Sequence, residues 1–437
     1  MAKITRKQKR EKLEEINFFE EFLRIQKHFF KELIPNLRYI KDNRHQSYIE
    51  YSTDIIFFVL IMKNVTALQS MNQMTTEFNK DKCINNVAKT LGYQDLEELP
   101  HHDTINNFLK KLNPNEIEKI RNYMVKELLK KRCLEHYRLL EKYWTIAVDA
   151  TGLASFKERH CENCLKREYV NKETGEIEKT IYFHYVLEAK LVVGDMVLSI
   201  DTEFIENEEF YEKQDCELKA FKRLAERLKK NYKRLPICIL GDSLYAVDPI
   251  FKICNKNNWK YIFTFKEGRT KSIWLDFEGL KKLKDNSNIK GYTWVNEIEY
   301  KDNVVNVLEA KLVENKKEKE FTFITDIAIK ENNAEKILFA GRSRWKIENE
   351  GFNNQKNIKN NIGHLCCKDY NAMKNHYLLV QIADILRQLF ECGYELVRSL
   401  RASIKEISSR LLESFRRDTL TPEDIANLNN RMQIRCL

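Results

Sequence analysis

Two aspartates follow short apolar runs and are placed to share a cation. Asp149 follows the run 143–148, and Asp242 follows the run 237–240 and one glycine. Both runs have the length and composition of buried strands, and ligand sites of open α/β sheets form where such strands end. If the two strands are neighbours, their carboxylates converge. Taken alone, each aspartate could equally cap the element that follows it.

A third acid lies in residues 342–352, which are predicted to be helical. Arg344 and Glu348 are four residues apart and therefore share a face of this helix. An exposed Arg–Glu pair is the simplest interpretation of that spacing. Two strand-end aspartates and a helical glutamate, however, are hard oxygen ligands of the kind that bind Mg²⁺ or Mn²⁺. Such a set suits two-metal phosphoryl transfer.

These segments together resemble the DDE transposases of bacterial insertion sequences, which have a ribonuclease-H-like catalytic core. They are most similar to the group marked by a Tyr-x2-Arg-x3-Glu-x6-Lys signature, and the residues Arg-Trp-Lys-Ile-Glu at 344–348 fit its Arg-x3-Glu part. The resemblance extends from about residue 95 to about residue 395. Its most specific parts are Asp149, the Gly-Asp-Ser-Leu-Tyr-Ala segment at 241–246 and the segment 342–356, and residues 202–217 are also typical.

The resemblance implies a mechanism and a set of site residues. Asp149, Asp242 and Glu348 would be the catalytic acids that hold two Mg²⁺ or Mn²⁺ ions. The enzyme would cut DNA at the transposon end, release a 3′-OH and join that hydroxyl to target DNA. The DNA-binding residues would be Arg342, Arg344 and Lys356, with Arg344 either binding a phosphate near the scissile bond or orienting Glu348.

The chain departs from the signature at two positions. Gly341 stands at the position of the tyrosine and Gln355 at that of the lysine, with Lys356 one residue later. Glu350 competes with Glu348 for the third acid, but that alignment would place Lys346 at the signature arginine. We therefore prefer Glu348.

The elements that position these residues indicate an α/β protein with a mixed sheet, a β-strand insertion, and helical regions at both ends, and the resemblance implies that the sheet is ribonuclease-H-like. Strands are expected at 143–148, 182–193, 195–204, 237–240 and 260–265, and helices at 210–232 and 248–257. The predicted organisation is a helical DNA-binding region (1–140), the first part of the catalytic core (141–269), an antiparallel β insertion (270–330), the core helix that carries Glu348 (331–395) and a C-terminal helical region (396–437).

A second metal site is suggested by Cys161 and Cys164, which form a Cys-x2-Cys pair. Such a pair binds structural Zn²⁺ only when further ligands complete the set. The candidate partners are His160, His184, His364, Cys366 and Cys367, none at diagnostic spacing. Free thiols in a basic loop are the alternative.

Two other groups of residues have alternative roles. Residues 201–217 contain eight acids, of which Glu203 and Asp215 could support the metal ligands, while a solvated helix face is the simpler interpretation. Trp274 or Trp294 could stack on a flipped base, or both could pack in a core.

The composition favours an intracellular protein that binds nucleic acid. Lys and Arg number 75 against 65 Asp and Glu, which gives a net charge of +10, and basic residues cluster at 3–12, 108–132 and 397–417. The longest apolar run, 55–62, is too short to cross a membrane, and the 11 cysteines have no regular spacing. We expect a cytoplasmic, nucleoid-associated homodimer that binds double-stranded DNA, both terminal inverted repeats and target. The alternatives are a metal-dependent nuclease without strand transfer and a catalytically inactive, transposase-derived DNA-binding protein.

Overall fold

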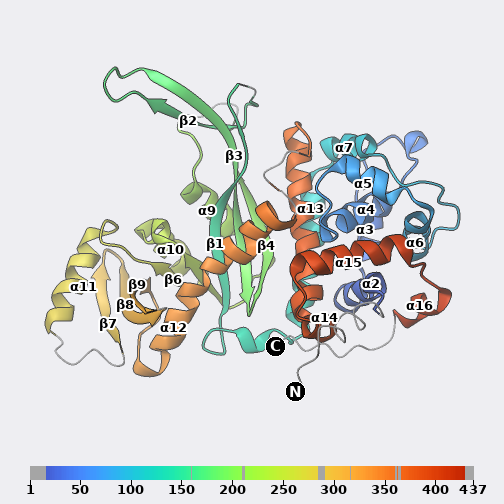
Figure 1. Ribbon diagram of the computed structural model, residues 1–437. Coiled ribbons are helices and arrows are strands. Elements are labelled where there is room, and N and C mark those ends of the chain that lie inside the picture. Colours follow the sequence, from blue (N-terminus) through green and yellow to red (C-terminus); the bar gives the residue numbers. More distant parts are fainter. Residues whose placement is uncertain are drawn as a thin grey trace. The chain divides into compact units, whose positions relative to one another are not determined.

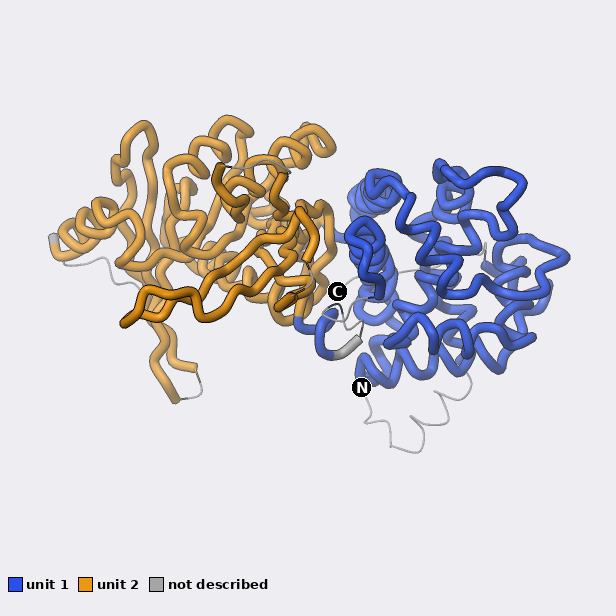
Figure 2. The backbone as a smooth tube through the Cα atoms, turned by 90° about the horizontal axis from the view of Figure 1, so that it is seen from above, with its two compact units in different colours: residues 1–134, 353–437 blue, residues 135–352 orange. Residues whose placement is uncertain are grey.

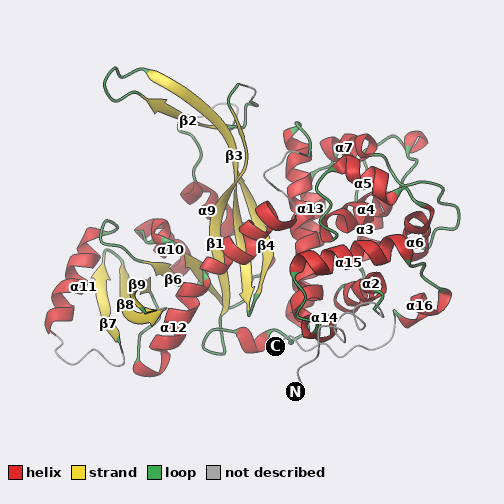
Figure 3. Cartoon of the chain, viewed as in Figure 1, coloured by secondary structure: helices red, strands yellow, loops and turns green. Residues whose placement is uncertain are grey.

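The chain folds into two compact units (Figures 1 and 2). A computed structural model describes residues 16–158, 160–208, 212–283, 291–314, 316–359, 362 and 366–428. One unit is helical and combines residues 1–134 with 353–437, and the other, residues 135–352, contains the sheet. The mixed α/β class expected from the sequence is confirmed (Figure 3).

A single mixed sheet forms the centre of the second unit, in the order β2-β3-β1-β5-β6-β9-β8-β7, with β4 paired to β3. Strands β1 and β5, and β5 and β6, are parallel, whereas β3 is antiparallel to both β1 and β4. The strands are β1 (Trp144–Phe156), β2 (Leu165–Val170), β3 (Ile177–Val193), β4 (Met196–Ile205), β5 (Ile237–Gly241), β6 (Lys260–Thr264), β7 (Tyr292–Tyr300), β8 (Asn303–Glu314) and β9 (Lys317–Thr325).

The apolar runs of the sequence become the central strands because both faces of the sheet are covered. Every residue of β5 is buried, as parallel strands require. Helix α9 (Glu217–Asn231) packs on β3 and β4, while α12 (Glu331–Ser343) packs on β5, β6, β8 and β9. Helix α10 (Asp248–Asn257) has the bounds expected from its sequence and begins with a proline in its first turn.

The predicted β insertion continues the same sheet. Its three strands, β7 to β9, are antiparallel, and β9 pairs with β6. Helix α11 (Lys271–Leu283) precedes them and packs on β7. The sequence pattern did not predict a helix in this stretch.

Some expected boundaries were wrong, and one strand was missed. Strand β1 does not end before Asp149 but continues to Phe156, because β3 pairs with it along that whole length. The helix expected to begin at residue 210 begins at Glu217, and residues 209–211 lie outside the described part of the chain. Strand β2 is not predicted by the sequence pattern. It pairs with β3 to form a hairpin that projects beyond the rest of the sheet (Figure 1).

The helical unit is built around two buried helices. α4 (Thr53–Val65) is buried along its whole length, and α13 (Tyr370–Gln388) packs against α4, α7 and α8. The other helical segments of this unit are α2 (Phe18–Phe29), α3 (Leu33–Arg38), η1 (Gln46–Tyr48), α5 (Met71–Phe78), α6 (Asp81–Leu91), α7 (His102–Lys111), α8 (Pro114–Lys130), η5 (Leu389–Gly393), α14 (Glu395–Ser399), α15 (Ile404–Arg417) and α16 (Pro422–Asn427).

The basic C-terminal stretch contributes to the core of this unit. Helix α15 buries Ile407, Leu411 and Phe415 and packs on α2 and α6. Its arginines lie on the other, more exposed side, as its amphipathic pattern predicts. The basic cluster at 3–12 lies outside the described residues. Within the described part of the chain, every helix is too short or too polar to cross a membrane.

Candidate active site

Asp149 and Asp242 lie level with each other on two adjacent parallel strands. The last residue pair between β1 and β5 is Ala147 with Leu240, and the two aspartates come two residues further along each strand. Strand β5 ends at Gly241, so Asp149 occupies the point at which β1 loses its parallel neighbour. Ala147, on the same face of β1 as Asp149, belongs to the core beneath α12. The strand register therefore brings the two backbones to the same level, the condition on which the expected convergence depends.

Asp242 is fixed by the turn that follows it. Its Oδ1 accepts a hydrogen bond from the backbone N–H of Leu244 at 2.7 Å and caps the short helix η3 (Ser243–Tyr245). A Cβ at Gly241 would lie 2.8 Å from the ring of Tyr245, so only glycine lets that buried ring pack beneath the strand end. The capping role and a ligand role are compatible, because a carboxylate has further lone pairs available.

Glu217 is a fourth acid at this place, and the sequence pattern alone did not single it out. The hydroxyl of Tyr245 donates a hydrogen bond to Oε1 of Glu217 at 2.6 Å. Burial raises the pKa of Glu217, the hydrogen bond from Tyr245 opposes this, the charge of Asp242 raises the pKa further and that of Arg344 lowers it. Glu217 therefore lies within electrostatic reach of both Asp242 and Arg344.

Glu348 and Arg344 form an ion pair after the end of α12. Nη1 of Arg344 donates to Oε1 of Glu348 at 2.7 Å. The arginine side chain is 9% exposed and the carboxylate 38%, so the acid keeps contact with solvent while its partner is buried. Glu348 lies in η4 (Ile347–Lys359), a segment with π-helical hydrogen bonding. Such helices are uncommon and are frequent at functional sites.

The pKa of Asp149 responds to all the charged groups of this site. Its pKa is raised to about 7, mainly by burial; Arg344 opposes the shift, and the carboxylates of Glu348, Glu217 and Asp242 add to it. Arg344 thus compensates Asp149, Glu217 and Glu348 together. Carboxylates crowded in this way bind a proton or a cation, and their oxygens are the donors that Mg²⁺ and Mn²⁺ prefer.

The carboxylate oxygens of these acids lie further apart than the ligand atoms of a single bound cation. Among the described residues, only two sets of three or more acidic, cysteine or histidine ligand atoms lie within 4.8 Å of one another. One is Cys161, Cys164 and His184, and the other is the exposed or half-buried group 101–103 at the start of α7. The carboxylates of Asp149, Asp242 and Glu348 do not form such a set.

Three other acids of the run 201–217 are held by arginines of α9. Arg227 binds Asp201 at 2.9 Å and also Glu203, and Arg223 binds Asp215 at 2.6 Å and also Glu203. Glu203 and Asp215, which the sequence suggests as supports for the metal ligands, thus fasten α9 to the sheet. Glu217 is the acid of this run whose charge interacts with those of Asp149 and Asp242.

The cations expected to contact DNA have different surroundings. The guanidinium of Arg342 pairs with Glu314 of β8 and lies over the ring of Phe321, 4.6 Å from its centroid. Arg344 is buried beside the acids, and Lys356 is half-buried in the helical unit. Arg342 also lines a groove of about 750 Å³ together with Trp274 and the exposed Trp345. Trp294, by contrast, packs against the core beneath α12.

The two departures from the transposase signature have structural reasons. A Cβ at Gly341 would lie 2.6 Å from the ring of Phe323, so the packing of α12 on β9 leaves no room for a tyrosine there. Gln355 is fully buried and bonds through its amide to Gln381 and Asp384 of α13. Both positions therefore serve packing in this chain.

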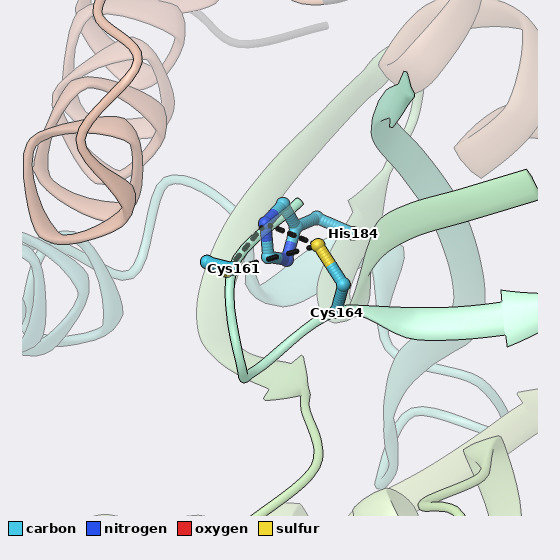
Figure 4. A group of neighbouring side chains, drawn as sticks. All are labelled: Cys161, Cys164 and His184. Carbon is cyan, nitrogen blue, oxygen red and sulfur yellow. Dashed lines mark hydrogen bonds between the residues drawn. The ribbon is translucent and has the colours of Figure 1, made fainter. Parts of the chain in front are cut away.

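Of the candidate partners of the Cys-x2-Cys pair, the structure brings His184 close to both thiols. Cys161 and Cys164 lie beside His184 of β3 (Figure 4). His364 lies outside the described residues, and Cys366 and Cys367 belong to the helical unit.

A scan of the chain against models of known protein families gives no match, and a search of curated proteins gives none either. The chemistry assigned to the chain therefore has to be argued from its residues and their geometry.

Proposed function

We propose that the chain is a DDE transposase, an enzyme that cleaves DNA at the ends of its element and joins the released 3′-OH to target DNA. The observation that carries the proposal is the half-buried Asp149, level with Asp242 at the end of the neighbouring strand and within electrostatic reach of Glu217, Glu348 and Arg344. This places acids from distant parts of the chain at one sheet edge.

The donor set fits Mg²⁺ or Mn²⁺. Asp149, Asp242 and Glu348 would hold the ions, and Tyr245 keeps the Glu217 carboxylate beside them. When bound, the ions supply Lewis acidity that activates the attacking oxygen and stabilises the leaving one. The protein itself supplies half-buried carboxylates and the buried positive charge of Arg344.

Arg344 has a donor that suits a phosphate. Its Nη1 bonds to Glu348, while its Nε is buried and makes no hydrogen bond within the described part of the chain. A buried donor without a partner costs free energy, which a phosphate oxygen would recover. Arg344 would thus orient Glu348 and bind the scissile phosphate at the same time.

The topology supports the ribonuclease-H-like core that the resemblance implies. Three antiparallel strands, β4, β3 and β1, are followed by the parallel strands β5 and β6, with α9 before β5 and α10 between β5 and β6. The acids lie on β1, directly after β5 and after α12. The groove lined by Trp274, Trp345 and Arg342 offers aromatic faces on which an unpaired base could stack.

Strand transfer tests the proposal directly. The full chain is incubated with Mg²⁺ or Mn²⁺, a target plasmid and a duplex that carries the sequence flanking its own coding region, cut to leave a 3′-OH. We expect covalent joining of the duplex to the plasmid by a protein that binds as a dimer, and weaker binding as salt is raised, since phosphate contacts dominate. Cleavage of the same duplex supplied uncut, without joining of the cut one, would instead identify a nuclease, and DNA binding without either an inactive derivative.

A further inference from the structure

The loop between β1 and β2 brings two thiols to the imidazole of His184 on β3. Sγ of Cys161 and Sγ of Cys164 are 3.7 Å apart, and Nε2 of His184 is 3.4 Å from the first sulfur and 3.3 Å from the second (Figure 4). The three atoms therefore form a nearly equilateral triangle. Their separations are those of ligands around a common centre.

The triangle has the size that a tetrahedral zinc ion requires. With Zn–S bonds of about 2.3 Å and Zn–N bonds of about 2.0 Å, tetrahedral angles place two sulfurs about 3.8 Å apart and a sulfur and a nitrogen about 3.5 Å apart. The observed distances agree with these values to within a few tenths of an ångström. A disulfide requires sulfurs about 2.0 Å apart, and it would not require an imidazole nitrogen close to both sulfurs.

The ligands are held by regular structure. His184 is 2% exposed and pairs with Ala154 at the point where the register between β1 and β3 shifts. Cys164 is 5% exposed and directly precedes β2, and its N–H bonds to the carbonyl of Cys161 at 3.2 Å, which closes the turn between the two thiols. The site is thus preorganised on three adjoining segments of the hairpin base.

We propose that Cys161, Cys164 and His184 bind one structural Zn²⁺ ion, with water as the fourth ligand. His160 does not join the set, because its ring stacks on Tyr182 with centroids 3.6 Å apart. Two thiolates and one imidazole form a borderline-soft set that favours zinc over Mg²⁺. This site is chemically distinct from the acid cluster and does not depend on the proposed DNA chemistry.

The zinc site would fix the base of the projecting hairpin and the segment before α9. The side chain of Asn207 donates to the carbonyl of Cys164 at 2.9 Å and accepts from the N–H of Asp215 at 3.1 Å. Asn207 is 1% exposed, and its backbone N–H bonds to the carbonyl of Asn163 at 3.2 Å. Since Glu217 follows Asp215 by two residues, zinc would stabilise the approach to this acid.

Metal analysis of the full chain, purified under reducing conditions, tests the site. We expect about one zinc per chain in the wild type. Cys161→Ser and Cys164→Ser should each bind zinc at least about tenfold more weakly in competition with a chelator, because each loses a thiolate ligand. The exposed Cys216 gives the control Cys216→Ser, which should keep the full content.

Cobalt substitution of the wild type keeps the test decisive if a variant fails to fold. Co²⁺ bound here should show the intense visible bands of a tetrahedral ion and a thiolate charge-transfer band in the near ultraviolet, and zinc should abolish both. A wild-type chain with no zinc and no such bands would overturn the proposal. So would zinc retained in full by folded Cys161→Ser and Cys164→Ser proteins, or a Cys161–Cys164 disulfide that persists under reducing conditions.

Discussion

The guanidinium of Arg344 serves two acids at once. It donates a 2.7 Å hydrogen bond to Glu348, one helical turn further along the chain, and its charge opposes the upward shift in the pKa of Asp149. A helix that follows the β insertion is thereby coupled electrostatically to the first strand of the sheet. The acid site depends on this one buried cation.

Replacing Arg344 by methionine should move the pH dependence of cleavage. Without the guanidinium, the pKa of Asp149 rises above its present value of about 7, so the acid limb of the pH–rate profile should shift to higher pH. At a pH well below the pKa, a rise of the pKa by about one leaves roughly tenfold less of the carboxylate ionised. The exposed Arg234 provides the matched control Arg234→Met. An unchanged acid limb in Arg344→Met would contradict the role given to this arginine.

Two variants separate the charge of Glu217 from its hydrogen bond. Glu217→Gln keeps an acceptor for Tyr245 but removes one of the crowded charges, so Mg²⁺ affinity should fall while metal-free stability is kept or improved. Tyr245→Phe removes the donor and should lower the free energy of unfolding by about 1 kcal/mol. Calorimetric metal titration and urea denaturation measure the two effects. Glu226, exposed on α9, gives the control Glu226→Gln, and equal metal affinity in Glu217→Gln and this control would exclude Glu217 from the site.

Alanine should have opposite effects at two helical glycines. At Gly341 a Cβ meets the buried ring of Phe323 at 2.6 Å, so Gly341→Ala should destabilise the protein by about 1–3 kcal/mol. At Gly279 of α11 nothing lies within 4 Å, so Gly279→Ala should stabilise it by up to about 1 kcal/mol through helix propensity alone. Denaturation midpoints distinguish the two effects. Two stabilising changes would show that α12 does not pack on β9 as closely as described.

Acid should destabilise the chain through His376. Burial, helped by the charge of Lys63, lowers the pKa of this histidine to about 3, and its Nε2 lies 2.9 Å from Oδ1 of Asn106. The unfolded chain gains the proton first, so this contribution to stability is complete above about pH 6.5 and is lost as pH falls towards 3. The loss approaches about 1.4 kcal/mol per pH unit.

The variant His376→Gln isolates that contribution, since glutamine can still donate to Asn106. Urea denaturation at several values between pH 7 and pH 4 should show a shallower loss of stability in the variant than in the wild type. Parallel curves for the two proteins would mean that the histidine is protonated in the folded state.

The sequence predicted best what depends on local pattern. Apolar runs located β5 and β6, and a proline after an aspartate located α10, because burial and capping are encoded within a few residues. The condition it set for Asp149 and Asp242, that their strands are neighbours, is met by the pairing of β1 with β5. The predicted strand at 143–148 was too short, because the second half of β1 mixes small and polar residues and is held by pairing with β3.

What depends on tertiary contact was not readable from the sequence. Glu217 is one of eight acids in a short run, and only the hydroxyl of Tyr245 distinguishes it. His184 was one of several candidate ligands, and the register of β3 against β1 and β2 selects it. The sequence shows only that Gly341 replaces the signature tyrosine, whereas the reason, the ring of Phe323 beside it, is a tertiary contact.

Metal-dependent cleavage by aspartate variants decides whether the acids at the strand ends are catalytic. The full chain, Asp149→Asn, Asp242→Asn and the control Asp302→Asn, in the exposed turn between β7 and β8, are compared on DNA carrying the element's ends. We expect cleavage by the wild type and the control with Mg²⁺ or Mn²⁺, and end binding without cleavage by the two aspartate variants. Cleavage at the wild-type rate by either variant would contradict the assignment.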